Sequence, residues 1–315
     1  MTLNETMGNP AAARIAVLGS LNMDVVLNLQ RMPQCGETVH AQGLQYVPGG
    51  KGGNQALACA RHGAQVVLFG CVGRDAHGNT LRTTLQQGGV EVGYVQVHDS
   101  VPTGTAVVMV EPDGSNRIAV VAGANAVAEL PMPSFVAALT GAQYLVLQLE
   151  SPLELLDRAI KVAHAAGCKV VLNPSPVQDL PAHWWPMLEM LVLNEHEAQQ
   201  LSGIVVVDED SALRAARHLQ AQGVAQVVIT LGAMGVVALD ASGYCIHPAI
   251  KVEVVDTTSA GDTFLGTLLT RLGEGMALGT AVQWGIRAAS LCVGRRGAQP
   301  SIPQRSEVES MMVAP

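Results

Sequence analysis

The stretch that decides the fold reads Val254-Val255-Asp256-Thr257-Thr258-Ser259-Ala260-Gly261-Asp262-Thr263-Phe264, an apolar strand end that runs through small residues into a helix. Ser259, Ala260 and Gly261 carry little or no side chain. A phosphate group can therefore approach the backbone N–H groups at the start of the helix, where the helix dipole favours negative charge. The stretch predicts an anion hole at residues 259–262.

Asp262 stands at the edge of this predicted hole. A carboxylate beside a bound phosphate is repelled unless it has a chemical role, and the role that fits is to take a proton from an attacking hydroxyl. This interpretation predicts phosphoryl transfer, with Asp262 as the general base. The alternative is that Asp262 and Thr263 only cap a helix, because Asp and Thr are common near helix N-termini. The stretch alone leaves both interpretations open.

Length and composition narrow the class of protein. The chain has 315 residues, of which 49% are hydrophobic, so it can fill a sizeable core as one large domain or two ordinary ones. Its formal net charge is -8, without a cluster of Lys and Arg, which argues against nucleic acid or an anionic membrane surface as a partner and favours a small ligand. Aromatic residues make up only 3%. Abundant Ala, Val, Leu and Gly favour helices packed on a parallel sheet, the α/β class.

The chain shows no sign of a membrane segment or a disulfide framework. The six cysteines form no C-x-x-C pair, and we expect most of them to be buried thiols. No apolar run reaches the roughly 18 residues of a membrane span, and residues 1–13 lack the pattern of a signal peptide. We therefore expect a cytoplasmic protein with no membrane partner, and a loose N-terminal tail over residues 1–13.

Two polar residues follow the first predicted strand, Ile15–Leu18. Asn22 and Asp24 are spaced by two, which puts both side chains on one face of an extended chain. Such a pair can donate to and accept from neighbouring sugar hydroxyls. The alternative is an Asx turn.

Short alternating segments interrupt the β/α pattern in two places, about residues 23–48 and 102–122. The second contains a predicted turn at Pro112-Asp113-Gly114 between two short strands. We infer that the two segments form a small separate sheet, a lid. An exposed sheet edge is a pairing hazard, and two lids that pair in a homodimer would remove it.

Between these segments lies a glycine-rich loop, Pro48-Gly49-Gly50-Lys51-Gly52-Gly53-Asn54-Gln55, which opens a helix. It is not a Walker A loop, because the order G-x-x-x-x-G-K-[ST] is absent. Glycine lets the backbone come close to a ligand or take positive φ, while Lys51 and Asn54 supply a charge and an amide. We favour a binding role over a flexible loop with a solvated lysine, because the glycines directly precede a good helix.

Strands that end in polar residues supply further candidates. Glu150 follows the strand Tyr144–Leu149, at the strand end where open α/β sheets bind ligands, although it could merely favour the start of the next helix, for which Ser151 is the expected cap. Asn194 ends the strand Leu191–Asn194. It could meet Glu197 to hold a hydrated magnesium ion, although Glu in a first helical turn is also ordinary capping chemistry.

A later strand, Val227–Thr230, runs into the glycine turn Leu231-Gly232-Ala233-Met234-Gly235, which suits the lining of a nucleotide pocket. The sequence lacks the motifs of several other enzyme classes. No H-E-x-x-H metal motif and no G-x-S-x-G elbow occurs. The absence of G-x-G-x-x-G after the first strand counts against a nicotinamide oxidoreductase.

Seven motifs follow one another between Ile15 and Pro303: Gly19-Ser20-Leu21-Asn22-Met23-Asp24, Gly49-Gly50-Lys51-Gly52-Gly53-Asn54-Gln55, Gln148-Leu149-Glu150-Ser151-Pro152, Asn194-Glu195-His196-Glu197, Thr230-Leu231-Gly232, Asp256-Thr257-Thr258-Ser259-Ala260-Gly261-Asp262 and Gly297-Ala298-Gln299-Pro300-Ser301. In order and spacing they resemble the ribokinase family of carbohydrate kinases. The resemblance implies a three-layer α/β/α kinase domain over residues 14–303, with a mostly parallel central sheet, a small β-sheet lid and a C-terminal tail over residues 304–315.

The resemblance also implies a reaction and its residues. The reaction is the phosphorylation of D-ribose by ATP at the 5-hydroxyl, with Asp262 as base and residues 259–262 as the anion hole. The sugar would be held by Asn22, Asp24, Gly50, Lys51, Asn54, Glu150 and Asp262. ATP would contact Asn194, Thr230, Leu231, Gly232, Ala233, Met234, Gly235, Gly261 and Ile286. Mg²⁺ would be supported through water by Glu197, and an activating K⁺ would be bound by Asp256, Thr258, Cys292, Arg295, Gly297 and Ser301.

Two residues depart from the family pattern. Ser259 stands where Gly or Ala is usual, and Leu265 stands where Asn is common. Ser259 is small enough to leave the backbone amides usable, whereas Leu265 could alter either core packing or contacts near the adenine. Two alternatives stay open: a kinase of the same fold for another acceptor, such as deoxyribose, a hexose derivative or adenosine, and a sugar-binding module without turnover.

Overall fold

The computed structural model describes residues 12–112 and 115–313. Their main sheet has the order β14-β13-β12-β11-β10-β9-β1-β4-β5, and β6 also pairs with β4. The pairs from β12 through β1 to β5 and β6 are parallel, whereas β13 and β14 join antiparallel. The strands are β1 (Arg14–Leu18), β4 (Gln65–Gly73), β5 (Val90–Glu91), β6 (Val95–His98), β9 (Tyr144–Gln148), β10 (Lys169–Asn173), β11 (Leu188–Asn194), β12 (Gln226–Thr230), β13 (Val236–Asp240) and β14 (Gly243–His247).

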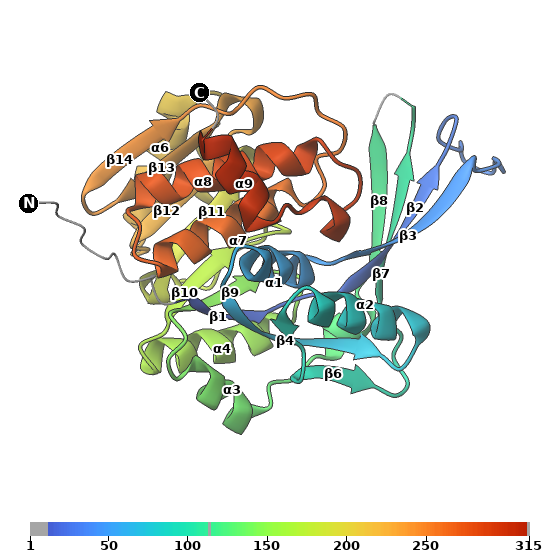
Figure 1. Ribbon diagram of the computed structural model, residues 1–315, viewed down its shortest axis with the longest axis horizontal. Helices are drawn as coiled ribbons and strands as arrows, with labels where there is room; N and C mark the ends of the chain where they lie inside the picture. Colours follow the sequence, from blue (N-terminus) through green and yellow to red (C-terminus); the bar gives the residue numbers. More distant parts are fainter. Residues whose placement is uncertain (1–11, 113–114, 314–315) are drawn as a thin grey trace, which may run out of the picture.

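Helices cover both faces of this sheet (Figure 1). In β1, Ala16 and Leu18 pack into the core beneath one helical layer, while Ile15 and Val17 pack beneath the other, as alternation along a strand requires. One layer contains α3 (Met132–Leu139), α4 (Leu153–Ala165), α5 (Glu195–Ser202) and α6 (Glu209–Gln220), and the other contains α1 (Lys51–Arg61), α2 (Ala76–Gln87), α7 (Ala260–Gly273) and α8 (Leu278–Val293).

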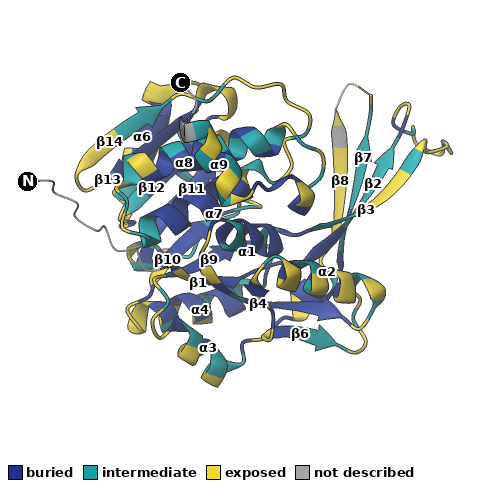
Figure 2. Cartoon of the chain, in the orientation of Figure 1, coloured by how far each residue is buried: buried dark blue, intermediate teal, exposed yellow. Residues whose placement is uncertain are grey.

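The central strands are buried on both faces (Figure 2), which is why they read as continuous apolar runs. The predicted three-layer α/β/α class is therefore confirmed. Short 3₁₀ segments complete the described elements: η1 (Gly123–Val127), η2 (Trp185–Met187), η3 (Gly232–Met234) and η4 (Gln299–Ser301). No helix among residues 12–112 and 115–313 is long and apolar enough to cross a membrane.

A second, smaller sheet stands to the side of the main one (Figure 1). It has the order β3-β2-β7-β8 and contains β2 (Asn22–Asn28), β3 (Gly43–Gly49), β7 (Gly104–Val110) and β8 (Asn116–Val121). The predicted lid, built from two segments distant in sequence, is thus confirmed as a separate sheet. Asp113 and Gly114 of the predicted turn lie outside the described residues.

Three local predictions need correction or completion. Helix α4 begins at Leu153 with Pro152 as N-cap and no side-chain cap, so the prediction of Ser151 as cap is wrong; Pro152 has an extended ψ of 132° and the helix can begin only after it. Residues 1–11 of the predicted loose tail lie outside the described residues, but Ala13 is buried and accepts a hydrogen bond from Gln65. After Pro303 the chain forms α9 (Arg305–Val313).

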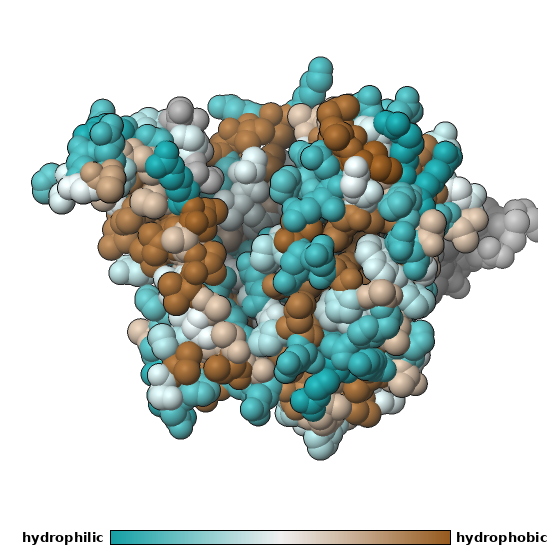
Figure 3. All heavy atoms as spheres, turned by 180° about the vertical axis from the view of Figure 1, so that it is seen from behind, coloured by the Kyte–Doolittle hydropathy of each residue, from teal (hydrophilic) through white to brown (hydrophobic). Residues whose placement is uncertain are grey.

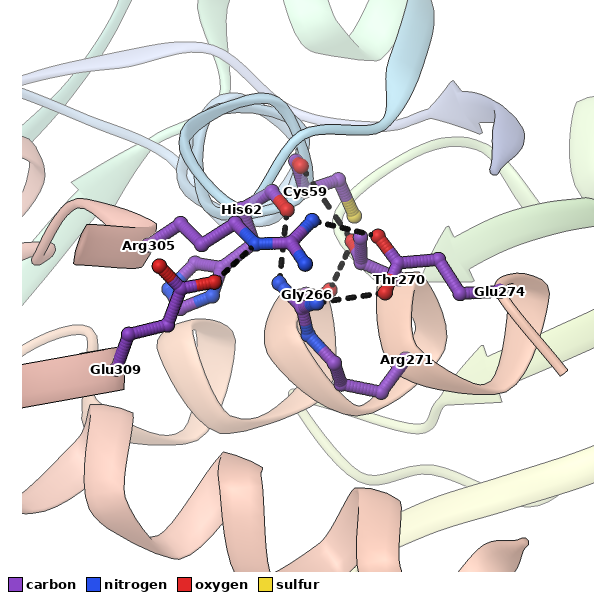
Figure 4. Close-up of polar contacts among 8 residues, drawn as sticks. All are labelled: Cys59, His62, Gly266, Thr270, Arg271, Glu274, Arg305 and Glu309. Atoms are coloured by element: carbon purple, nitrogen blue, oxygen red, sulfur yellow. Dashed lines mark hydrogen bonds and ion pairs between the residues drawn. The ribbon is translucent and has the colours of Figure 1, made fainter. Parts of the chain in front are cut away.

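A buried charged cluster joins the C-terminal ends of α1 and α7 to α9 (Figure 4). Arg271 is fully buried; it forms an ion pair with Glu274 at 2.6 Å and donates to the backbone carbonyl of His62 at 2.9 Å. Its guanidinium also lies over the ring of Trp284, 4.5 Å from the centroid. The opposite ends of α1 and α7 enter the site described next, so the cluster holds these two helices together behind it.

Arg305 on α9 completes the cluster. It forms ion pairs with Glu274 at 2.8 Å and with Glu309 at 2.7 Å. Burial, together with the charges of Arg271 and Arg305, lowers the pKa of His62 to about 3. The imidazole of His62 is therefore neutral at physiological pH, and it adds no charge to the pair of arginines.

Candidate active site

Asp262 lies in the first turn of α7 and is buried. Asn54 of α1 donates its side-chain amide to Asp262 Oδ2 at 3.0 Å, and Gln55 donates to Asp262 Oδ1 at 2.8 Å. Both oxygens of the carboxylate therefore accept a hydrogen bond from α1. The structure brings Asp262 and Asn54 together, as a shared role towards one hydroxyl requires, although 208 positions separate them. The Asp262 side chain does not cap the helix that it opens, because Ser259 is the N-cap and no side-chain bond caps it.

The start of α7 has an unusual backbone. Ser259 has φ of 65°, the only positive φ of a non-glycine residue in the described part of the chain. The N–H of Ala260 donates to Thr257 at 3.3 Å, whereas the N–H groups of a first helical turn have no partner inside the helix. A Cβ placed on Gly261 would meet no atom within 4 Å, so the space beside this residue is open. The predicted anion hole thus has an open approach at Gly261.

We expect the substitution Ser259→Gly to leave the free energy of unfolding unchanged or to raise it by up to about 1 kcal/mol, because glycine takes positive φ without strain. Ser259→Val should lower that free energy by about 1–3 kcal/mol, because a β-branched residue is strained at positive φ. Chemical unfolding of the two variants and the wild type measures the difference. Equal free energies of unfolding in all three proteins would show that backbone strain at residue 259 does not affect stability.

Asn22 and Asp24 both lie in β2, so the alternative of an Asx turn is wrong. The side chain of Asn125 holds Asn22: it donates to Asn22 Oδ1 at 2.8 Å and also bonds both the N–H and the C=O of Leu21. This leaves the amide N–H₂ of Asn22 as its free donor group. Sequence reasoning missed Asn125, because it comes from η1, 103 positions away, and no local pattern marks it.

The glycine-rich loop packs against the end of β1 without room for side chains. A Cβ on Gly50, whose φ is 87°, would lie 2.6 Å from the backbone nitrogen of Asn22, and a Cβ on Gly52 would lie 2.5 Å from the carbonyl carbon of Gly19. The N–H of Lys51 then points to Glu150 Oε2 at 3.5 Å, and Ser20 also donates to this carboxylate. Glycine here permits a close approach of backbones, which brings the backbone of Lys51 beside Glu150. That the two residues bind a sugar stays a prediction.

Three carboxyl groups meet in this region. Burial, followed by the negative charges of Glu150 and Asp262, raises the pKa of Asp24 from 3.8 to about 7. The absence of a side chain at Gly49 accommodates Asp24, because a Cβ there would lie 2.4 Å from Asp24 Oδ2. Buried carboxylates with perturbed pKa values are typical of functional sites.

The raised pKa of Asp24 predicts a pH dependence of stability. Between its unfolded pKa of 3.8 and its folded pKa of about 7, the folded protein keeps a proton that the unfolded chain releases, so this group makes the protein less stable as pH rises through that window. We expect Asp24→Asn to remove the effect. The free energy of unfolding of the variant minus that of the wild type should increase from pH 4 to about pH 8. A difference that does not change with pH would contradict the prediction.

A cavity of about 420 Å³ opens beside the start of α7. Six residues predicted to contact ATP line it: Thr230, Gly232, Ala233, Gly235, Gly261 and Ile286. Three do not. Asn194 is exposed, Leu231 is buried in the core and Met234 points to solvent with 43% of its surface exposed. Contacts of these three residues with ATP stay predictions.

Much of the remaining wall of the cavity is apolar, and several of its residues were missed by sequence reasoning. The loop 249–254 contributes Ile250, Val252 and Val254, and α8 contributes Ala289 and Val293. The loop has neither helical nor strand periodicity, so its apolar residues carry no sequence signal of a pocket.

Leu265, the second departure from the family pattern, lies in the core with 1% of its surface exposed, so it affects packing.

Asn194 and Glu197 meet as a capping box at the start of α5. Asn194 Oδ1 accepts from the N–H of Glu197 at 2.8 Å, and Glu197 Oε2 accepts from the N–H of Asn194 at 3.0 Å. The capping alternative is therefore what the structure shows. A role of Glu197 towards magnesium through water stays a prediction.

The residues predicted to bind potassium also come together. Asp256 accepts from the N–H groups of Thr258 and Gly297, both at 2.9 Å. The thiol of Cys292 lies 3.0 Å from the hydroxyl of Ser301 and 3.7 Å from the carbonyl of Thr258. Arg295 donates its N–H to the Cys292 carbonyl at 3.0 Å, and the Ser301 hydroxyl donates to Ala298 at 2.7 Å. Carbonyl and hydroxyl oxygens of this kind fit a hard cation.

An α/β fold with a lid, a buried carboxylate at a helix N-terminus and a cavity beside it define a phosphotransferase for small hydroxyl compounds. Residues 12–305 match the family described as "pfkB family carbohydrate kinase", and the chain belongs to this family. Among its relatives, a ribokinase of Haemophilus influenzae is 37% identical over 93% of this chain and 96% of the relative. A ribokinase of Bacillus subtilis is 36% identical over 95% of this chain and 99% of the relative.

Solved structures lead to the same family. The structure of an Arabidopsis thaliana ribokinase complexed with ribose and ATP aligns with a TM-score of 0.90 at 32% identity, over 96% of this chain and 100% of that one. A ribokinase of Thermotoga maritima aligns with a TM-score of 0.85 at 34% identity, over 96% of this chain and 100% of that chain. The family resemblance of the seven motifs is thus confirmed.

Proposed function

We propose that this protein transfers the γ-phosphoryl group of ATP to the 5-hydroxyl of D-ribose, giving ribose 5-phosphate. One observation carries the proposal: Asp262 is bonded to Asn54, acts together with Glu150 on the charge of Asp24, and directly follows Gly261, which lines the cavity. The named activity of relatives that cover nearly the whole chain supports the same acceptor and donor.

The residues divide the chemical work between them. Asp262 Oδ2 takes the proton of the acceptor hydroxyl while its oxygen attacks the phosphorus atom, and the proton leaves on the carboxyl group. Backbone N–H groups at residues 259–262 stabilise the negative charge of the transferring group. The lid excludes water, which would otherwise compete as acceptor. Magnesium, when bound to the phosphates of ATP, neutralises charge that develops on them, and we propose Glu197 as its support through water.

The sugar side can distinguish one acceptor from another. Asn22 offers amide donors, Asp24 and Glu150 offer acceptors, and Lys51 offers a charged donor. Buried polar groups that are matched to substrate hydroxyls reject a compound that lacks one of them, since a group is then left unpaired. We therefore expect ribose to be a better acceptor than deoxyribose.

Potassium is proposed as an activator that rigidifies the anion hole. The support is that the thiol of Cys292 lies beside both the carbonyl of Thr258, next to Ser259 in the chain, and the hydroxyl of Ser301, so segments far apart in the sequence meet at the anion hole. Initial rates are measured in buffer free of sodium and potassium and then with added potassium chloride, with tetramethylammonium chloride as a control for ionic strength. Rates that do not respond to potassium would refute the proposal.

We also propose a homodimer that forms through the lid. Tyr46 and Leu44 on β3 expose more than half of their surface, as do Ile118, Val120 and Val121 on β8. Figure 3 shows apolar side chains gathered over this part of the molecule. β3 and β8 are the two edge strands of the lid. Pairing with the lid of a second copy would bury these apolar side chains and give hydrogen-bond partners to the backbone groups of the edges. A monomeric mass in light scattering would contradict the dimer.

The acceptor is tested by measuring ADP production with ATP and a panel of ribose, deoxyribose, fructose 6-phosphate and adenosine. We expect the highest kcat/KM with ribose. A higher value for another compound would assign that acceptor instead. Ribose binding without any consumption of ATP would favour the sugar-binding module without turnover.

A further inference from the structure

Two buried glutamines connect the general base to the central sheet. Gln55 and Gln148 each expose none of their surface. Gln148 is the last residue of β9, and its neighbour across the sheet, Asn173, is the last residue of β10. Both strands end beneath the start of α1, which carries Gln55. The mechanism proposed above gives no role to the side-chain amides of Gln55 and Gln148.

The hydrogen bonds give the amide of Gln55 one orientation. Gln148 Nε2 donates to Gln55 Oε1 at 2.6 Å, so the N–H₂ group of Gln55 faces the other way. Asn173 donates to the carbonyl of Val192 at 3.0 Å, which turns its Oδ1 towards Gln55 Nε2 at 3.2 Å. The remaining N–H of Gln55 then donates to Asp262 Oδ1 at 2.8 Å. Each amide fixes the next, because an amide has distinct donor and acceptor ends.

The hydrogen-bonded chain from Gln148 through Gln55 to Asp262, here called the relay, needs the space that glycine leaves at position 19. A Cβ at that position would lie 1.9 Å from Gln148 Oε1, which no packing allows. Any residue larger than glycine would therefore displace the amide of Gln148. Gly19 is the first residue after β1, so the relay is built into the junction between β1 and the loop that carries Asn22.

We propose that Gln55 is a positioning residue, which holds Asp262 Oδ1 by its amide so that Oδ2 faces the acceptor hydroxyl. The inference rests on the proposed function, since it assigns Asp262 the role of base. Asn54 donates to Oδ2 from the same helix, so the carboxylate cannot rotate about its terminal bond without losing both hydrogen bonds.

The test compares Gln55→Leu and Gln55→Glu with the wild type in kcat and in KM for sugar and for ATP. We expect kcat to fall by about 10- to 100-fold in both while KM for ATP stays within about twofold. Gln55→Leu removes the donor to Asp262 Oδ1, and Gln55→Glu replaces it with a second carboxyl group. A merely structural role of Gln55 would not lower kcat and leave both KM values in place.

Gln148→Leu removes the group that orients Gln55 and leaves Gln55 in place, so kcat should fall less, by about 3- to 10-fold. The control is Gln143→Leu, which removes an exposed amide with two hydrogen bonds, to Arg14 and Gly273, at the other end of the sheet. It should keep the wild-type kcat and KM values. If Gln55→Leu fails to fold, Gln55→Glu and Gln148→Leu carry the test.

Folded Gln55 variants with wild-type kcat would overturn the inference, and so would variants that lose kcat only together with a matching rise in both KM values. The acceptor panel keeps this outcome separate from a failure of the proposed function. The variants are assayed with whichever panel compound the wild type phosphorylates best, so a preference for another sugar changes the proposed acceptor and leaves the ratio of variant to wild type informative.

Discussion

Replacing Asp262 with Asn should lower kcat by about 100- to 10,000-fold, the range expected when a general base is removed. An amide cannot accept the proton of the attacking hydroxyl. Its N–H₂ group would also face the donors of Asn54 or Gln55, which now bond the two carboxylate oxygens. Steady-state kinetics with saturating ATP and sugar measure the effect, and we expect KM for ATP to change little, since Asp262 does not line the cavity proposed for the nucleotide.

Asp208→Asn is the matched control for this substitution. Asp208 caps α6 by accepting from Ser211 at 2.8 Å, and Asn is an equally good N-cap, so both stability and kcat should stay near the wild-type values. An Asp262→Asn enzyme that retains more than about a tenth of the wild-type kcat would refute the assignment of Asp262 as the base.

The second large effect concerns stability. Glu274→Gln should lower the free energy of unfolding by about 3–5 kcal/mol, the cost of removing one partner from a buried ion pair. Glu274 is the shared partner of Arg271 and Arg305, and Arg271 has no access to solvent (Figure 4). Without the carboxylate, the positive charge of Arg271 stays buried beside a second arginine, and its remaining partners, the carbonyl of His62 and the ring of Trp284, carry no negative charge.

Glu309→Gln separates this effect from a general loss of surface charge. Glu309 forms an ion pair with Arg305, and the two side chains expose 46% and 38% of their surface. Losing this pair should lower the free energy of unfolding by less than about 1 kcal/mol. Chemical unfolding of both variants measures the difference. Equal losses in the two would mean that burial adds nothing to the strength of the Glu274 pairs. The folded Glu274→Gln enzyme should keep its KM values, because the cluster lies at the far ends of α1 and α7.

Local patterns in the sequence predicted much of this molecule. Apolar runs such as Val227–Thr230 and Tyr144–Leu149 indicated buried parallel strands, since both faces of such strands are covered. The small residues 259–261 placed the start of α7, and the glycines around Lys51 indicated a close approach of backbones. These properties depend on neighbouring residues, whose spacing reports directly on burial and backbone conformation.

By itself, then, the sequence determined the fold class, the lid and the residues that approach the site. Only the tertiary structure decided how these residues act on one another: that Gln55 and Gln148 form a relay to Asp262, that Asn125 orients Asn22, and that the loop 249–254 closes the cavity. The physical reason is distance along the chain. Each of these contacts joins segments that are far apart in sequence, and the periodicity of a strand or helix indicates that a side chain is buried without indicating which partner it meets.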